Sequence, residues 1–243
     1  MITSTSSSQV KHVVNLQKKA KLRKEEKQFV VEGVKMVSEA PADRLVKVYV
    51  SETFKADNEE FLERMNYDSI GKDVLEIVTD NVFMRMADTQ TPQGIMAVVR
   101  MSDTDLEGIL SDKRNPLLLI IENLQDPGNL GTIVRMAEGA GVTGIIMSSN
   151  TVDIYNPKTI RSTMGSLYRV PVIYVDDICE AADVCKSKGV TVYAAHLNGT
   201  DNYNKKDYTN PTAFMIGNEG NGLTDKLADK ADEYVRIPMQ GEV

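Results

Sequence analysis

The stretch PLLLIIENLQDPGNLGTIVRMAEGAGV (116–142) decides the fold. Its first part, PLLLIIEN (116–123), is a near-continuous apolar run, as is typical of a strand buried on both faces of a parallel sheet. A tight loop, DPGN (126–129), leads into a helix expected over 128–142. A buried strand followed at once by a helix is the repeating unit of an open parallel α/β sheet.

The same alternation continues to the end of the sequence. Further strands are predicted at 143–149, 171–175, 190–197 and 212–218, and helices at 157–165, 177–188 and 223–230. Ligands of such sheets bind beyond the carboxyl ends of the strands. We therefore expect the site near Glu122-Asn123, His196-Leu197 and the segment from Gly217 to Gly222.

Residues 1–100 form a second region that also alternates between helix and strand, as an α/β sandwich does. Its helices are expected at 9–24, 34–40, 56–65 and 79–87, and its strands at 29–33, 45–50, 74–78 and 94–100. Residues 101–115 carry several charges and few strand formers, which predicts a linker. The expected domains are therefore 1–100 and 116–243, joined by 101–115.

The composition indicates a globular protein, with 42% apolar and 26% charged residues. No apolar run approaches the ~18 residues that a membrane helix needs, and MITSTSSSQVKHVV (1–14) lacks the apolar core of a signal peptide. Cys179 and Cys185 have no metal-ligand spacing and are expected to be reduced thiols. These features favour a cytoplasmic protein without a structural metal.

The charge of the chain is unevenly distributed. The net charge is −7, yet residues 1–35 hold eight Lys and Arg against three Glu, a net of +5 that leaves −12 for the rest. Because affinity for a polyanion follows the local field more than the total charge, this segment is a candidate RNA-binding surface. A solvated helix face is the alternative explanation.

Arg135 is the most informative charge in the C-terminal region. Its helix neighbours Ile133, Val134, Met136 and Ala137 are apolar, and a charge in such a setting usually has a partner or a function. The loop before it has a purely structural explanation, a turn with Asn129 as the helix N-cap.

Two later segments add weaker signals. FMIGNEGNGL (214–223) places three glycines and Glu219 after a buried strand, which lets a ligand approach the backbone. The order of these glycines matches neither GxGxxG nor a phosphate-binding GxxxxGK[ST] loop. YVRIPMQGEV (234–243) contains a short extended apolar run before a turn.

Taken together and in order, these motifs resemble those of the SpoU (TrmH-like) branch of SPOUT RNA methyltransferases. The resemblance rests on Asn123, DPGN, Gly131, Arg135, GNEGNGL and IPMQG. RSTMGSLYRVPV (161–172) resembles the segment between the first two motifs, and residues 2–33 resemble the RNA-binding domain of such proteins. The likeness thus covers nearly the whole chain.

The resemblance implies S-adenosylmethionine-dependent 2′-O-methylation of ribose in structured RNA. It implies a trefoil-knotted C-terminal α/β domain with a parallel sheet, an obligate homodimer whose active sites are built by two subunits, and a small ribosomal-protein-like α/β domain that binds RNA. The cofactor-binding residues carried over are Leu197, Ile216, Gly217, Glu219, Gly220, Ile237 and Met239. The residues expected to bind RNA are Lys11, Lys18, Lys19, Arg23, Lys24 and Arg161.

Arg135 and Asn123 are the residues carried over as catalytic. A guanidinium stays protonated and is a poor base, so we expect Arg135 to bind the phosphate beside the target ribose and to stabilise developing alkoxide. Asn123 would orient Arg135 or the ribose. Glu219 has a structural alternative, in which it accepts hydrogen bonds from loop amides. His196 invites a general-base role, but packing or hydrogen bonding is commoner for a histidine at a strand end.

Ribosomal RNA is favoured over tRNA as the substrate because the N-terminal domain resembles a ribosomal protein. The alternatives are a tRNA ribose methyltransferase, a non-catalytic RNA- or ribosome-binding protein on this fold, and a small-molecule α/β enzyme that uses another nucleotide. No membrane or metal partner is expected. In the family the third motif continues beyond the position of Gly241, and this continuation closes the knot, contacts the cofactor and forms much of the dimer interface. The sequence given ends at Val243.

Overall fold

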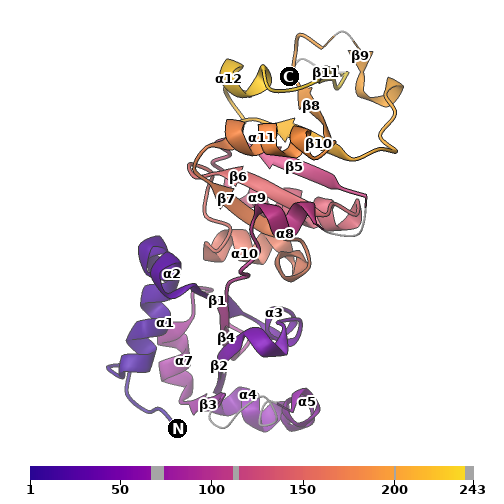
Figure 1. Ribbon diagram of the computed structural model, residues 1–243. Coiled ribbons are helices and arrows are strands. Elements are labelled where there is room, and N and C mark those ends of the chain that lie inside the picture. Colours follow the sequence, from indigo (N-terminus) through magenta and orange to yellow (C-terminus); the bar gives the residue numbers. More distant parts are fainter. Residues whose placement is uncertain (67–73, 112–114, 200, 239–243) are drawn as a thin grey trace. The chain divides into compact units, whose positions relative to one another are not determined.

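The structure is a computed structural model that describes residues 1–66, 74–111, 115–199 and 201–238. It contains two compact units, each built around its own sheet (Figure 1). The first unit comprises residues 1–102 and 153–168, and the second comprises 103–152 and 169–243. Residues 153–168, which the sequence analysis assigned to the C-terminal domain, therefore pack with the N-terminal residues.

The first unit is an α/β sandwich around a mixed four-stranded sheet of order β1-β4-β2-β3. The central strand β4 pairs antiparallel with β1 and β2, and β2 pairs parallel with β3. Helices α1 and α7 lie on one side of the sheet, and α3, α4 and α5 lie on the other (Figure 1). The strands are β1 (Gln28–Glu32), β2 (Leu45–Ser51), β3 (Leu75–Val78) and β4 (Ile95–Arg100). The helices are α1 (Ser8–Lys18), α2 (Ala20–Glu26), α3 (Val34–Ser38), α4 (Glu52–Asp57), α5 (Glu59–Met65), α7 (Asp80–Met86) and α10 (Pro157–Thr163), with short 3₁₀ turns at Ala42–Arg44 and Ser166–Tyr168.

The helix predicted over 9–24 is interrupted at Lys19. This residue is extended, with φ −116° and ψ 101°, and separates α1 from α2. The interruption lets Arg23 fold back, so that its Nη1 donates to the carbonyls of Leu16 (2.6 Å) and Gln17 (2.9 Å) at the end of α1. The side chain thereby satisfies carbonyls that a helix C-terminus leaves without partners.

The second unit holds a parallel seven-stranded sheet of order β7-β6-β5-β10-β8-β11-β9. Strand β5 lies inside the sheet between β6 and β10, and its Leu118 and Ile120 are fully buried with residues of α11 and α12 in one core. The strands are β5 (Leu117–Ile121), β6 (Gly144–Ser148), β7 (Val172–Val175), β8 (Thr191–Ala195), β9 (Asp201–Asn202), β10 (Thr212–Ile216) and β11 (Glu233–Arg236). The helices are α8 (Leu106–Leu110), α9 (Pro127–Gly139), α11 (Ile178–Ser187) and α12 (Asp225–Ala228), with a 3₁₀ turn at Tyr203–Lys205.

The segment predicted as a linker contains helix α8, which packs into the second unit. Ile109 of α8 is 1% exposed and lies in the core beneath the sheet. A Cβ at Gly144, the first residue of β6, would lie 2.4 Å from the Ile109 side chain. Gly144 therefore provides the space that Ile109 fills, and residues 106–110 are part of the core.

Candidate active site

The sites predicted in the C-terminal region meet at the carboxyl edge of the parallel sheet. Strands β5, β10, β8 and β11 are consecutive neighbours in that order. Residues 122–126 leave β5, residues 217–224 leave β10, His196 and Leu197 leave β8, and Ile237 leaves β11. Because parallel strands end at one edge, these four segments lie at the position where ligands bind to such sheets.

Asn123 forms a tight turn directly after β5. Its φ of 55° is uncommon for a non-glycine residue. Its N–H donates to Ser148 Oγ (2.9 Å), and its carbonyl accepts from Gln125 Nε2 (3.0 Å) and Asn218 Nδ2 (2.9 Å). The bonds to Ser148 and Asn218 tie the end of β5 to the ends of β6 and β10, and the bond from Gln125 closes the turn itself.

Helix α9 starts from this turn and carries Arg135. Asp126 is the N-cap, since its carboxylate accepts from the N–H of Asn129 (2.7 Å), and Pro127 occupies the first helical position. The N-cap is thus Asp126 and not Asn129, the alternative considered from the sequence. Arg135 is exposed, and among the described residues its guanidinium has no ion-pair or hydrogen-bond partner.

The loop after β10 is held in shape by Asn218 and requires glycine at position 217. Asn218 exchanges backbone hydrogen bonds with Gly222, both 2.9 Å, and its Oδ1 accepts from the N–H groups of Gly220 (2.9 Å) and Asn221 (3.1 Å). A Cβ at Gly217 would lie 2.0 Å from the carbonyl carbon of Gly222. No side chain fits there, so the close approach of the two backbone segments depends on glycine.

Glu219 joins the two loops. Its carboxylate accepts from the N–H groups of Gln125 (3.3 Å) and Asp126 (3.1 Å) and from Asn129 Nδ2 (3.2 Å). Desolvation raises the pKa of Glu219, but the hydrogen bonds from its own amide, Asp126, Asn129 and Gln125 outweigh it and leave the pKa below its ordinary value. The structural alternative weighed for Glu219 thus has clear geometric support.

The other residues predicted to bind cofactor form an open apolar part of the edge. Leu197 is 87% exposed and Ile237 is 56% exposed, while Ile216 ends β10 half-buried and Gly220 is exposed in the loop. Met239 lies outside the described residues.

His196 has local partners that explain its position. Its N–H donates to the carbonyl of Val235 (3.1 Å), its Nδ1 accepts from the N–H of Asn198 (3.2 Å), and its ring lies 4.8 Å from the ring of Tyr234. These contacts suit a packing and hydrogen-bonding residue.

The basic residues predicted to bind RNA divide into exposed and buried ones. Lys11, Lys18, Lys19 and Lys24 are exposed on α1, α2 and the break between them. Arg23 is only 3% exposed and donates to Asp153 Oδ2 through Nε (3.0 Å) and Nη2 (2.6 Å). We therefore leave Arg23 out of the RNA-binding surface, because its guanidinium is fully engaged inside the first unit.

Comparison with known proteins relates this geometry to a family. Residues 116–243 match the SpoU rRNA Methylase family, and residues 7–97 match the MRM3-like substrate binding domain. The chain belongs to the SpoU rRNA Methylase family. The resemblance drawn from the ordered motifs is confirmed, as is the prediction of an α/β fold with a parallel C-terminal sheet. The knot stays a prediction.

This chain is similar to individual members of the SpoU family and to solved structures, and the aligned length differs from one to the next. The chain is 33% identical to a 23S rRNA guanosine 2′-O-methyltransferase of Bacillus subtilis over 172 residues, 68% of this chain and 64% of that protein. It therefore spans less than two thirds of that relative. It is 30% identical to an uncharacterized tRNA/rRNA methyltransferase of Synechocystis over 100% of this chain and 86% of that protein. The AdoMet-bound rRNA methyltransferase from Sinorhizobium meliloti aligns with a TM-score of 0.82 at 27% identity, over 99% of this chain and 89% of that chain.

Glu122 and Asn218 of this SpoU protein were predicted to lie near the site, but their roles in holding the loops were not predicted, and Ser148 was not among the predicted site residues. Glu122, 6% exposed, accepts from the Thr224 N–H and hydroxyl, both 2.8 Å, and so fixes the far end of the glycine loop. Asn218 holds the near end, and Ser148 supports the Asn123 turn. A buried glutamate at the end of an apolar strand was the available signal, because a buried carboxylate needs partners.

Along the residues that the structure describes, no helix combines the length and apolar character needed to cross a membrane. Within the same residues, no three His, Cys, Asp or Glu side chains gather as metal ligands would.

Proposed function

We propose that this chain is an S-adenosylmethionine-dependent RNA 2′-O-methyltransferase that acts on ribosomal RNA. The observation that carries the proposal is Arg135, an exposed guanidinium without a partner among the described residues, on the helix that starts from the turn tied to the glycine loop. Family membership and the printed activity of the Bacillus relative support the reaction.

The carboxyl edge has features that suit the cofactor. The backbone approach at Gly217 leaves no room for a side chain, and Leu197 and Ile237 offer exposed apolar surface for an adenosine group. Leu197, Ile216, Gly217, Gly220 and Ile237 would hold it, with Met239 nearby in sequence. The AdoMet-bound Sinorhizobium structure supports the identity of the cofactor. When bound, S-adenosylmethionine supplies an activated methyl group on a sulfonium.

Arg135 would act on the RNA. Its fork of N–H donors fits a phosphate beside the target ribose and stabilises negative charge on the 2′-oxygen as the methyl is transferred. Asn123 would position this end of the site, since its turn precedes α9 directly. Glu219 acts as a positioning residue, because its carboxylate is occupied by the amides that begin α9.

The RNA would be bound with help from residues 1–100, while 116–243 carry the chemistry and 101–115 connect them. The exposed lysines at positions 11, 18, 19 and 24 supply the cationic surface. The match of residues 7–97 to a substrate binding domain supports this division. An rRNA substrate would also keep the protein in the cytoplasm, in agreement with its two free, buried cysteines.

We further propose that two copies associate, and that the C-terminal chain is knotted, as the family resemblance implies. Met136, on the helix of Arg135, is 66% exposed and gives apolar surface that a second copy could cover. Sedimentation equilibrium would test association, with a monomer at all concentrations as the contradicting result.

The decisive experiment measures cofactor binding and methyl transfer separately. Isothermal titration calorimetry should detect S-adenosylmethionine binding, and labelled methyl should pass to rRNA and not to tRNA. Nuclease mapping should locate the label on a ribose 2′-oxygen. Cofactor binding without transfer to any RNA would contradict the enzyme proposal, and transfer to tRNA alone would contradict the substrate.

A further inference from the structure

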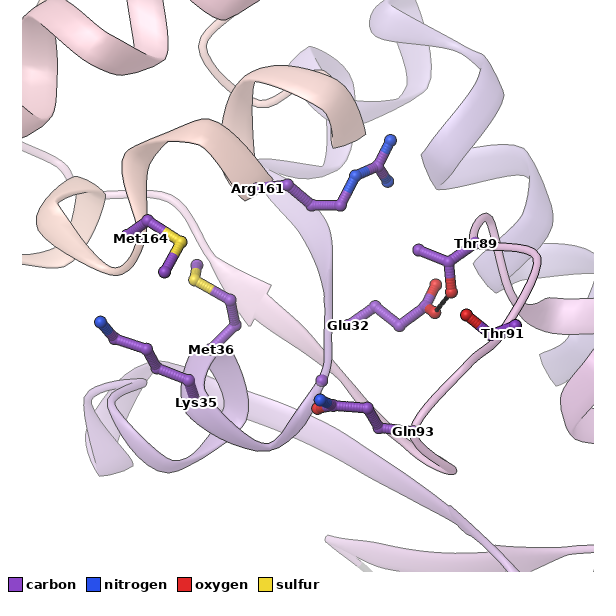
Figure 2. Close-up of a pocket in the computed structure, with 9 residues that line it drawn as sticks. Glu32, Lys35, Met36, Thr89, Thr91, Gln93, Arg161 and Met164 are labelled. Carbon is purple, nitrogen blue, oxygen red and sulfur yellow. Dashed lines mark hydrogen bonds between the residues drawn. The ribbon is translucent and has the colours of Figure 1, made fainter.

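A pocket of about 350 Å³ lies in the first unit, and none of its lining residues is among those assigned to methyl transfer. Its wall combines Lys35, Met36, Thr91 and Gln93 with Arg161 and Met164 from α10 and its C-cap (Figure 2). The first four come from the part that matches the substrate binding domain, and the last two from the part that matches the SpoU family. The volume is at the lower end of the range for small-ligand sites, about 300–1,000 Å³.

The polar groups still available in this pocket are mostly donors. Gln93 Oε1 accepts from the N–H of Val34 (2.7 Å), which leaves its Nε2 without a partner among the described residues. Arg161 donates through Nη1 to Asp88 (2.6 Å), and its other N–H groups have no hydrogen-bond partner in the part of the chain that the structure describes. Lys35 is 54% exposed, with only a 4.0 Å contact to Glu39. A ligand rich in acceptors would fit these groups.

The carboxylate of the wall, Glu32, is already hydrogen-bonded. It accepts from the N–H of Asp88 (2.9 Å) and from the hydroxyl of Thr89. Figure 2 shows Glu32 directed toward Thr89 and Thr91, on the side away from Lys35. An anionic ligand group could therefore lie near Lys35 while Glu32 faces the threonines.

Two methionines give the pocket its apolar part. Met36 is 6% exposed and forms a fixed wall, whereas Met164 is 44% exposed and sits at the mouth. Their sulfur atoms point toward one another in Figure 2. Met164 has φ 54°, a left-handed conformation that its position as the C-cap of α10 imposes. Thioether sulfur makes favourable contacts with aromatic rings.

We propose that this pocket binds one unstacked nucleotide of the RNA, with its base against Met36 and Met164 and its phosphate near Lys35 and Arg161. The inference rests on the proposed function, since an RNA substrate supplies the nucleotide. Single-stranded RNA is recognised through bases that are turned out of the stack and held by hydrogen bonds and stacking. Gln93 and Thr91 would donate to acceptors on the base or sugar. The pocket would set the position of the bound RNA at a nucleotide other than the one methylated.

The test uses the full chain labelled with ¹³C at the methionine methyl groups. AMP, GMP, CMP and UMP are titrated in turn, with inorganic phosphate and ribose 5-phosphate as reference ligands. At least one mononucleotide should shift the Met36 and Met164 signals, assigned with M36L and M164L, in a saturable way. The exposed Met84 should not respond. K35A should weaken binding up to about fivefold, as loss of one exposed charge contact implies, and K55A, a matched exposed lysine on α4, should not.

Three outcomes would overturn the proposal: no response of Met36 and Met164 to any mononucleotide, an equal response to inorganic phosphate, or equal effects of K35A and K55A. The measurement needs neither cofactor nor methyl transfer. Failure of nucleotide binding therefore leaves the proposed methyltransferase intact, while absence of methyl transfer leaves nucleotide binding measurable.

Discussion

Arg23 and Arg135 both looked like functional arginines in the sequence, but their surroundings differ in kind. Arg23, in the first unit, is buried against Asp153 and two helix carbonyls, and its donors are used within the protein. Arg135, in the second unit, is exposed on α9, and its guanidinium has no partner among the described residues. The first arrangement stabilises a fold, and the second leaves a cation available to a ligand.

The side chains at the carboxyl edge of the parallel sheet show the same contrast, between groups that are hydrogen-bonded within the protein and groups that are exposed. Glu122 and Glu219 accept hydrogen bonds from loop amides, and we expect them to support the site as positioning residues. Leu197 and Arg135, which those loops flank, are left open to solvent. Hydrogen-bond satisfaction thus separates residues that hold the site from residues that can meet a substrate. Four experiments test this distinction.

The largest effect is expected on stability from Arg23→Ala. Removing one partner of a buried ion pair leaves Asp153 Oδ2 and two carbonyls without their Arg23 donors and should cost about 3–5 kcal/mol. Urea unfolding followed by circular dichroism measures this loss. Arg161→Ala is the control, because its pair with Asp88 is about 40% exposed on both sides and should contribute less than about 1 kcal/mol. Equal losses in the two variants would show that burial does not distinguish them.

Arg135→Ala should abolish most methyl transfer while leaving the fold unchanged. Loss of a donor to developing negative charge typically lowers kcat about 10²–10³-fold, whereas an exposed substitution changes the free energy of unfolding by about 0.5 kcal/mol or less. Labelled methyl transfer, cofactor calorimetry and urea unfolding measure the three quantities. Arg135→Lys keeps the charge without the planar fork and should be intermediate. Wild-type turnover in Arg135→Ala would refute the role.

Gly217→Ala should damage both stability and cofactor affinity. The new methyl would lie 2.0 Å from backbone atoms of Gly222, and overpacking of this kind costs about 1–3 kcal/mol. Urea unfolding and cofactor calorimetry report the two effects. At Gly220 a Cβ would meet only Asn218 Oδ1, at 3.6 Å, so Gly220→Ala should remain close to the native protein in stability. Equal stability of Gly217→Ala and Gly220→Ala would contradict the claim that the backbone approach at position 217 requires glycine.

Glu219→Gln should give the smallest effect, and one that depends on pH. The pKa of Glu219 is lowered in the folded protein, so its contribution is fully present above the ordinary value of 4.5 and is lost as the pH falls through the lowered value. The difference in urea midpoint between wild type and variant should therefore be larger near about pH 7 than near about pH 3. If the difference in urea midpoint were the same at both pH values, the charge of Glu219 would not contribute to joining the two loops.

Local patterns predicted most of the fold. The apolar run at 117–121 is β5, and the alternation on either side of it predicted most other strands and helices to within a few residues. The single helix expected at 56–65 is instead two helices, α4 and α5, and strands β9 and β11 were not predicted. The break at Lys19 was not predictable from periodicity, because it depends on Arg23 reaching back to carbonyls of the preceding helix. The packing of Ile109 against Gly144 likewise links residues that are distant in sequence.

The sequence predicted where the candidate site lies, at the carboxyl edge of the parallel sheet. It did not predict the hydrogen bonds within that site. A parallel sheet brings the ends of β5 and β10 together, so Asn123 and the loop from Gly217 could be placed at one edge from their sequence positions. The bonds of Glu219 to the start of α9, and of Glu122 to Thr224, join residues more than 90 positions apart. Periodicity carries no information on such pairs, and a buried arginine cannot be told from an exposed one by its neighbours.

The grouping of residues 153–168 with 1–102 bears on the synthesis of the protein. Asp153, the partner of Arg23, and Tyr155, whose ring lies 4.7 Å from that of Phe29, both come from this segment. Completion of the N-terminal core therefore waits for Tyr168, 66 residues after Ser102. At translation rates of about 5–20 residues per second, that delay is roughly 3–13 s. During this interval Arg23 lacks its ion-pair partner Asp153, and expression of residues 1–102 alone would make that condition permanent.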